Sequence, residues 1–164
     1  MRKNGTYSCQ RVFAKGLLCP ELWTIPAREL QALAIGADTA TFLGNTLADW
    51  VDREEIYVSS DSRIALAWVV YETEKLDAYY RNRVSQIRSQ VEMTRLFHVD
   101  GKQIIADTGT RPDDLKFEDF CPGSEWEHGK QWMKLEVGEA VEKNIIKPVE
   151  KIKLEDDEEK NIYK

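Results

Sequence analysis

Residues 24–40, with the sequence TIPARELQALAIGADTA, carry the clearest periodic pattern in the chain. Thr24 is a good N-cap residue, and Pro26 is tolerated only in a first helical turn. Apolar residues then recur at helical spacing and make one stripe, formed by Leu30, Leu33, Ala34, Ala37 and Ala40. We therefore expect a helix that begins near Thr24 and buries this stripe.

Strand and helix signals alternate around this helix, which predicts an α/β or α+β domain. Strand signals cover Cys9–Lys15, Glu54–Ser60 and Arg95–Val99, where β-branched and aromatic residues gather. Further helices are expected at Arg63–Tyr71 and Leu76–Gln90. We expect the second of these strands to lie centrally in the sheet, with the first helix packed across it.

The chain has 164 residues, of which 42% are hydrophobic and 32% are charged. This length and composition are typical of one globular domain with a tail. The longest apolar run, residues 64–70, is far shorter than the roughly 20 residues that a membrane helix needs. The polar N-terminus lacks the apolar core of a signal peptide. We expect no membrane partner and an intracellular location, in the cytoplasm or nucleus.

The net charge and the cysteines bear on two classes of site. A net charge of −6 argues against strong autonomous binding of nucleic acid, because phosphate neutralisation drives that affinity. It does not exclude a nuclease, since a cluster of metal-binding carboxylates is itself acidic. Cys9, Cys19 and Cys121 are scattered and odd in number, so a disulfide framework or a zinc site is disfavoured.

Three acidic residues stand in unusual surroundings. Glu29 comes one residue before the apolar stripe, Asp61 closes a hydrophobic strand, and Asp107 is flanked by apolar and small residues. Such a carboxylate is either exposed by geometry or bound to a cation, because burying a bare charge is costly. Three carboxylates from separate elements can converge on magnesium, which prefers oxygen ligands. The alternative is that each is an ordinary helix-terminal charge or cap.

Five blocks of the sequence, in order, resemble the ribonuclease H domain of BEL/Pao-type retroelements. The family patterns are TIPRLELxAA, DSxxxLxW, VxNRVxxI, HV…NPADxxSRG and WxxGPxWL. The matching blocks are TIPARELQAL (24–33), SDSRIALAW (60–68), YRNRVSQI (80–87), the His-Val, Ala-Asp and Arg of residues 98–111, and WEHGKQWM (126–133). Together they span most of the chain.

The resemblance implies a ribonuclease H-like fold, in which helices flank a mixed sheet. It also implies that Glu29, Asp61 and Asp107 bind two Mg²⁺ or Mn²⁺ ions. Two such ions stabilise the attacking and leaving oxygens of a phosphodiester displacement. The implied activity is cleavage of the RNA strand of an RNA–DNA hybrid, beside the reverse transcriptase region of a polyprotein.

The chain departs from the family pattern at several positions. The family's first metal-binding aspartate lies on an opening strand, and here no acidic residue precedes Glu21. We therefore expect the opening strand to be missing. Ile104-Ile105 stands in place of Asn-Pro, and Pro112 stands in place of a glycine. These departures predict a weak or inactive nuclease.

The sequence also predicts how the chain is divided. Residues 1–133 are expected to form the partial ribonuclease H-like domain, and residues 134–164 a charged tail or linker. Glu136–Lys164 has almost no aromatic residues and ends in the acidic run Glu155–Glu159, which is typical of a solvated segment.

Other readings of the chain stay open. One is a non-catalytic interaction or nucleic-acid-binding module that keeps the fold, and another is a small interaction domain whose similarity is only ancestral. His98 can be a proton shuttle or a packed structural histidine. Arg81, Asn82 and Arg83 can contact a phosphate backbone or belong to an exposed helix face with salt bridges.

Overall fold

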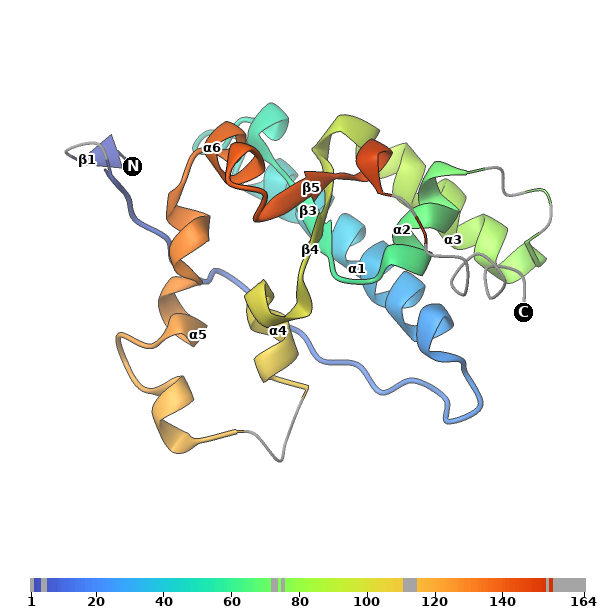
Figure 1. Ribbon diagram of the computed structural model, residues 1–164, viewed down its shortest axis with the longest axis horizontal. Coiled ribbons are helices and arrows are strands. Elements are labelled where there is room, and N and C mark those ends of the chain that lie inside the picture. The colour runs from blue at the N-terminus through green and yellow to red at the C-terminus, as the bar shows by residue number, and fades with distance from the viewer. Residues whose placement is uncertain are drawn as a thin grey trace. The chain divides into compact units, whose positions relative to one another are not determined.

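The computed structural model describes residues 2–3, 6–71, 74, 76–110, 115–152 and 154 (Figure 1). Its strands are β1 (Arg2–Lys3), β2 (Thr6–Tyr7), β3 (Val58–Ser60), β4 (Leu96–Val99) and β5 (Ile146–Pro148). Its α-helices are α1 (Ile25–Thr46), α2 (Arg63–Val70), α3 (Ala78–Gln90), α4 (Ile105–Thr108), α5 (Glu125–His128) and α6 (Val137–Glu142). Its 3-10 helices are η1 (Arg53–Glu55), η2 (Met93–Arg95), η3 (Gly101–Gln103), η5 (Phe117–Phe120), η6 (Gln131–Lys134) and η7 (Val149–Lys151).

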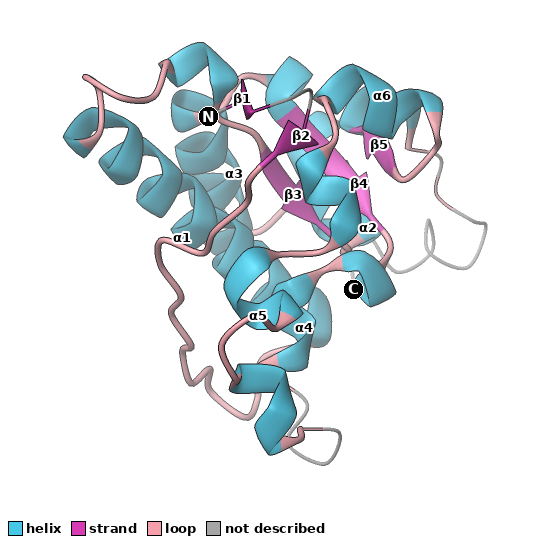
Figure 2. Cartoon of the chain, turned by 90° about the vertical axis from the view of Figure 1, so that its left-hand side faces the viewer, coloured by secondary structure: helices cyan, strands magenta, loops and turns pink. Residues whose placement is uncertain are grey.

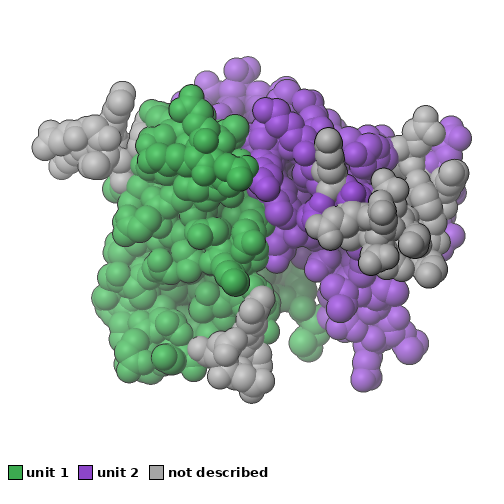
Figure 3. Space-filling model, in the orientation of Figure 1, with its two compact units in different colours: residues 1–18, 99–146 green, residues 19–98, 147–164 purple. Residues whose placement is uncertain are grey.

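The chain divides into two compact units, which Figure 3 draws in different colours. Unit 1 contains Met1–Leu18 and Val99–Ile146, and unit 2 contains Cys19–His98 and Lys147–Lys164. Among the described residues, none of the helices has the length and apolarity that crossing a membrane requires.

The main sheet has three strands in the order β3-β4-β5 (Figure 2). β3 and β4 are parallel, with Val58 opposite Leu96 and Ser60 opposite His98. The mixed α/β class predicted from the sequence is confirmed. The ribonuclease H-like fold within that class stays a prediction. The predicted central position of β3 is wrong, because β4 is the middle strand.

β3 is also shorter than the predicted strand at residues 54–60. Arg53–Glu55 form η1 instead, and the Asp52 side chain begins this turn by accepting a hydrogen bond from the Glu54 N–H at 2.9 Å. A side chain that caps the backbone locally offers it an alternative to strand pairing. The strand therefore begins only at Val58.

Helix α1 confirms the prediction made from residues 24–40. The Thr24 hydroxyl accepts a hydrogen bond from the Ala27 N–H at 3.4 Å, and Pro26 lies in the first turn. The predicted stripe is buried at Leu30, Leu33, Ala34 and Ala37. The helix continues through Gly44, where a Cβ would overlap the Cδ1 of Ile56.

Polar side chains join α1 to α3 along their length. The Tyr79 hydroxyl donates to Gln31 Oε1 at 2.6 Å, and Gln86 Nε2 donates to Asp38 Oδ2 at 2.6 Å. Both pairs are separated by 48 residues in the sequence. Because this offset stays constant, the two helices run in the same direction. Gln90 Nε2 also donates to Asp38.

One hydrophobic core lies in unit 2, between the helices and the sheet. α1 contacts α2, α3 and β3. The fully buried side chains of this core include Leu30, Leu66, Val69, Val84, Ile87 and Leu96. Trp68 is also buried here, and its ring centre lies 5.0 Å from that of Tyr80.

The segment after residue 136 is not a solvated tail as far as Ile152. Val149 and Ile152 belong to the core of unit 2, with exposed fractions of 1% and 7%. The Tyr71 hydroxyl donates to the Ile152 carbonyl at 3.3 Å. The predicted solvated tail is therefore wrong for this stretch. The apolar residues that stand singly between charged ones are buried, while the charged side chains face water. The acidic run at residues 155–159 lies outside the described residues.

Unit 1 contains short helices joined by irregular segments. The strand predicted at Cys9–Lys15 is absent, since residues 8–20 of the described chain contain neither helix nor strand. Instead, the Arg11 N–H donates to the Glu127 carbonyl at 2.7 Å, and the Arg11 guanidinium lies 4.6 Å from the centre of the Trp126 ring. Contacts with α5 replace strand pairing in this segment.

Candidate functional site

Glu29 lies in the second turn of α1, where its carboxylate meets the beginning of α2. The Ser62 hydroxyl donates a hydrogen bond to Glu29 Oε2. Burial raises the pKa of Glu29 above its ordinary value of 4.5; the Ser62 hydrogen bond opposes this rise, and the negative charge of Asp61 adds to it. Two carboxylates from different elements therefore lie close enough to interact.

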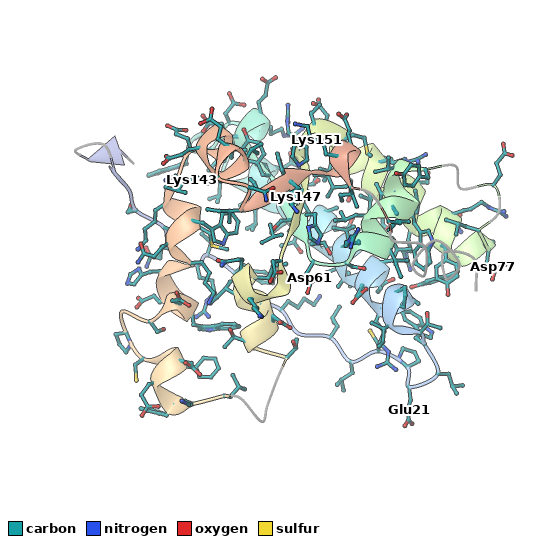
Figure 4. All side chains as sticks on the ribbon, in the orientation of Figure 1. Glu21, Asp61, Asp77, Lys143, Lys147 and Lys151 are labelled. Atoms are coloured by element: carbon teal, nitrogen blue, oxygen red, sulfur yellow. The ribbon has the colours of Figure 1, made fainter. Side chains whose placement is uncertain are left out.

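Asp61 follows β3 directly and leads into α2, a position labelled in Figure 4. Its side chain is exposed, whereas its neighbours Ser60 and Ser62 are buried. Ser62 is the N-cap of α2 and accepts a hydrogen bond from the Ala65 N–H at 3.2 Å. The Ser60 hydroxyl in turn accepts from the Ser62 N–H at 3.1 Å. This turn is held by its own side chains and presents Asp61 to solvent.

His98 lies beside Asp61, on the neighbouring strand β4. It pairs with Ser60 across the parallel ladder and forms a hydrogen bond to the backbone of Asp61. Burial lowers the pKa of His98 below 6.5, and the positive charges of Arg63 and Lys147 lower it further. The hydrogen bond and the charge of Asp61 act in the opposite direction. His98 is therefore favoured as a neutral imidazole in contact with the site.

Two of these neighbours had no functional assignment from the sequence. Lys147 was missed because it lies in the segment expected to be a tail, and it is placed on β5 (Figure 4). Ser62 had no assignment because its contact with Glu29 is set by tertiary packing. The sequence signal that could have identified Ser62 was the Asp61-Ser62 pair directly after a predicted strand. Parallel strands place their carboxyl-terminal ends at one edge of a sheet, where side chains can gather.

Asp107 lies on α4, in unit 1, whereas Glu29 and Asp61 lie in unit 2. Its backbone carbonyl accepts hydrogen bonds from the Thr110 N–H at 3.1 Å and the Thr110 hydroxyl at 3.0 Å. The turn that follows Asp107 is thus fixed locally. The convergence of all three carboxylates on one site stays a prediction.

Glu29 and Asp61 are carboxylates, the type of side chain that a divalent cation such as Mg²⁺ accepts as a ligand. Mg²⁺ is commonly bound by one or two carboxylates together with substrate phosphates and water. A cation beside the pair would also offset the repulsion between the two charges. No group of three or more His, Cys, Asp or Glu side chains within the described ranges is placed to hold a metal ion. A complete two-ion site is therefore not formed by these residues alone.

The two arginines considered from the sequence have structural partners, and so does His128. Arg81 donates to the Leu76 carbonyl at 2.8 Å, and Arg83 donates to Gln86 Oε1 at 3.0 Å. His128 Nδ1 lies 3.3 Å from the Cys9 carbonyl. All three cysteines are free thiols, as the sequence predicted.

Comparison with protein families, with curated proteins and with solved structures finds no match to this chain.

Proposed function

We propose that the chain carries part of a ribonuclease H-like site for metal-dependent hydrolysis of the RNA strand in RNA–DNA hybrids. The observation that supports this is the contact of Glu29 with the turn from β3 to α2, where Ser62 donates to Glu29 and the charge of the neighbouring Asp61 helps to raise the pKa of Glu29. These are two of the three acids that the sequence resemblance marks as metal ligands. The proposal includes a place beside the reverse transcriptase region of a retroelement polyprotein.

Four side chains have roles in the proposed site. Glu29 and Asp61 would hold a Mg²⁺ or Mn²⁺ ion. When bound, such an ion supplies Lewis acidity toward a phosphoryl oxygen and lowers the pKa of a coordinated water. Ser62 orients Glu29 by donating to it. His98 positions Asp61 through its backbone hydrogen bond.

The proposed activity is weak in this chain. Hydrolysis with two ions needs both ions at a fixed separation, which takes more carboxylates than Glu29 and Asp61 provide. Asp107 is the predicted third ligand, and the first aspartate of the family pattern has no counterpart in the sequence. Loss of one electrostatic contact to the transition state typically costs on the order of 100- to 1,000-fold in rate.

A non-catalytic module that keeps the same fold is the second candidate. It is favoured by the finding that no three metal-binding side chains gather within the described part of the chain. The net charge of −6 also fits a domain that relies on neighbouring domains for affinity toward nucleic acid. The two candidates differ in whether a divalent ion has any effect at Asp61.

Cleavage of an end-labelled RNA–DNA hybrid, with Mg²⁺ or Mn²⁺ and with a chelator, tests the proposal. We expect slow cutting of the RNA strand that Asp61→Asn abolishes. Asp100→Asn is the matched control, because Asp100 is exposed and its side chain only accepts from the Lys102 N–H, at 2.9 Å, a contact that asparagine keeps.

The outcomes separate the two candidates. Cutting that persists in Asp61→Asn would mean that this pair is not the site. Binding of the hybrid without any cutting, and without a response to metal, would support the non-catalytic module. Rapid cutting by the unmodified chain would contradict the prediction of weak activity.

A further inference from the structure

A cavity of about 380 Å³ lies in unit 2, away from Glu29 and Asp61. Its walls come from the second half of α1, from η1, from the end of α3 and from η2. This volume lies within the range of roughly 300–1,000 Å³ that is typical of small-molecule sites. No part of the proposed nuclease site contributes to it.

The charged side chains that line the cavity have a net positive charge, whereas the whole chain has a net negative charge. Three arginines line it, Arg53, Arg88 and Arg95, against two glutamates, Glu54 and Glu92. One of these glutamates is already paired, because Glu92 Oε2 lies 3.3 Å from an Arg95 nitrogen. The lining therefore carries a net positive charge in a chain whose net charge is −6. Such a local reversal favours an anionic ligand.

Two of the arginines are held in place by backbone carbonyls. Arg95 Nη1 donates to the Arg53 carbonyl at 3.0 Å. Arg88 donates through Nε to the Val69 carbonyl at 2.7 Å and through Nη2 to the Tyr71 carbonyl at 2.9 Å. A guanidinium carries five N–H donors, more than these bonds require. Fixed guanidinium groups lose little conformational entropy when they bind, which favours affinity.

The rest of the lining limits what kind of anion fits. Ala40, Ile56 and Val91 give the cavity an apolar wall. α3 ends at Gln90, in the lining, and the C-terminal end of a helix carries partial negative charge. A single negative charge on an apolar body suits these walls better than a multiply charged phosphate.

We propose that this cavity binds a carboxylate attached to an apolar body, held by Arg53 and Arg95 at the charged end and by Ile56 and Val91 along the apolar wall. The carboxylate can belong to a free small molecule or to the C-terminus of a peptide. A planar carboxylate matches the paired N–H groups of a guanidinium. The proposal does not depend on the nuclease assignment, since the two sites share no residue.

The test is an NMR titration of the ¹⁵N-labelled chain with benzoate, with N-acetylleucine as a mimic of a peptide C-terminus, and with uncharged benzamide. We expect saturable shifts at the Thr41, Ser89 and Val91 amides with one or both carboxylates, and none with benzamide. Whichever carboxylate binds more tightly identifies the source.

Two variants should change the affinity for the carboxylate in opposite directions. Arg53→Gln removes an exposed cation and should weaken binding roughly tenfold, because a charge-assisted hydrogen bond is lost. Glu92→Gln removes the carboxylate that competes for Arg95 and should strengthen binding. Lys102→Gln, which removes an exposed cation elsewhere, should change nothing. Equal shifts with benzamide, an unchanged affinity in Arg53→Gln, or no saturable shift would overturn the proposal.

Discussion

The Ser62 hydroxyl takes part in two contacts, since it caps α2 and donates to Glu29. Ser62→Ala removes both and should lower the free energy of unfolding by about 2 kcal/mol, the sum of a lost cap and a lost bond to a charged group. Urea denaturation measures this change. Ser89→Ala is the matched control, because that exposed hydroxyl only donates to the Gln86 carbonyl. Similar losses in both variants would mean that the Ser62 contacts add nothing.

Glu29 makes stability depend on pH. Because its pKa is raised in the folded chain, mainly by burial, the folded state binds the proton more tightly than the unfolded state. Its stabilising contribution is complete below pH 4.5, the ordinary value, and is lost as the pH rises through the raised folded pKa. As the pH rises through this range, the Glu29→Gln variant should therefore become more stable relative to the unmodified chain.

Urea denaturation at a series of pH values checks this expectation. Glu150→Gln serves as the control, because its side chain is exposed. A stability difference between the Glu29→Gln variant and the unmodified chain that stays constant with pH would contradict the raised pKa.

At the scale of elements, η7 and the residue after it belong to the core of unit 2. Val149 is only 1% exposed there, so Val149→Ala leaves a cavity and should cost about 2 kcal/mol of unfolding free energy. Val12→Ala makes the same chemical change at a side chain that is 72% exposed, and it should cost almost nothing. Denaturant unfolding of the two variants measures the difference. If both are equally mild, this segment does not contribute to the core.

For the whole molecule, binding of a divalent ion should be coupled to folding. An ion that binds only the folded chain stabilises it by mass action, by about 1.4 kcal/mol at tenfold excess over the dissociation constant. Mg²⁺ or Mn²⁺ should therefore raise the melting temperature, and Asp61→Asn should remove that gain. Asp100→Asn should keep it. Equal responses in both variants would show that Asp61 is not a ligand.

Local information in the sequence determined the long elements. α1 and α2 follow from a stripe of apolar residues together with a side-chain cap, Thr24 or Ser62, and both features lie within a few residues of each other. β4 and α3 were also predicted to within about two residues, from a run of apolar residues and from helical spacing, respectively. Where a local cap opposed the pattern, as at Asp52, the predicted strand was too long.

The sequence by itself marked Glu29 and Asp61 as candidate ligands, but only the tertiary structure decided their neighbours. Ser62 reaches Glu29 because α1 packs against α2, and His98 reaches Asp61 because β4 pairs with β3. Strand order and the burial of Val149 are likewise set by contacts between segments far apart in the chain. Periodicity and caps describe how one segment folds, whereas pairing and packing depend on free energies shared between segments, which no single segment encodes.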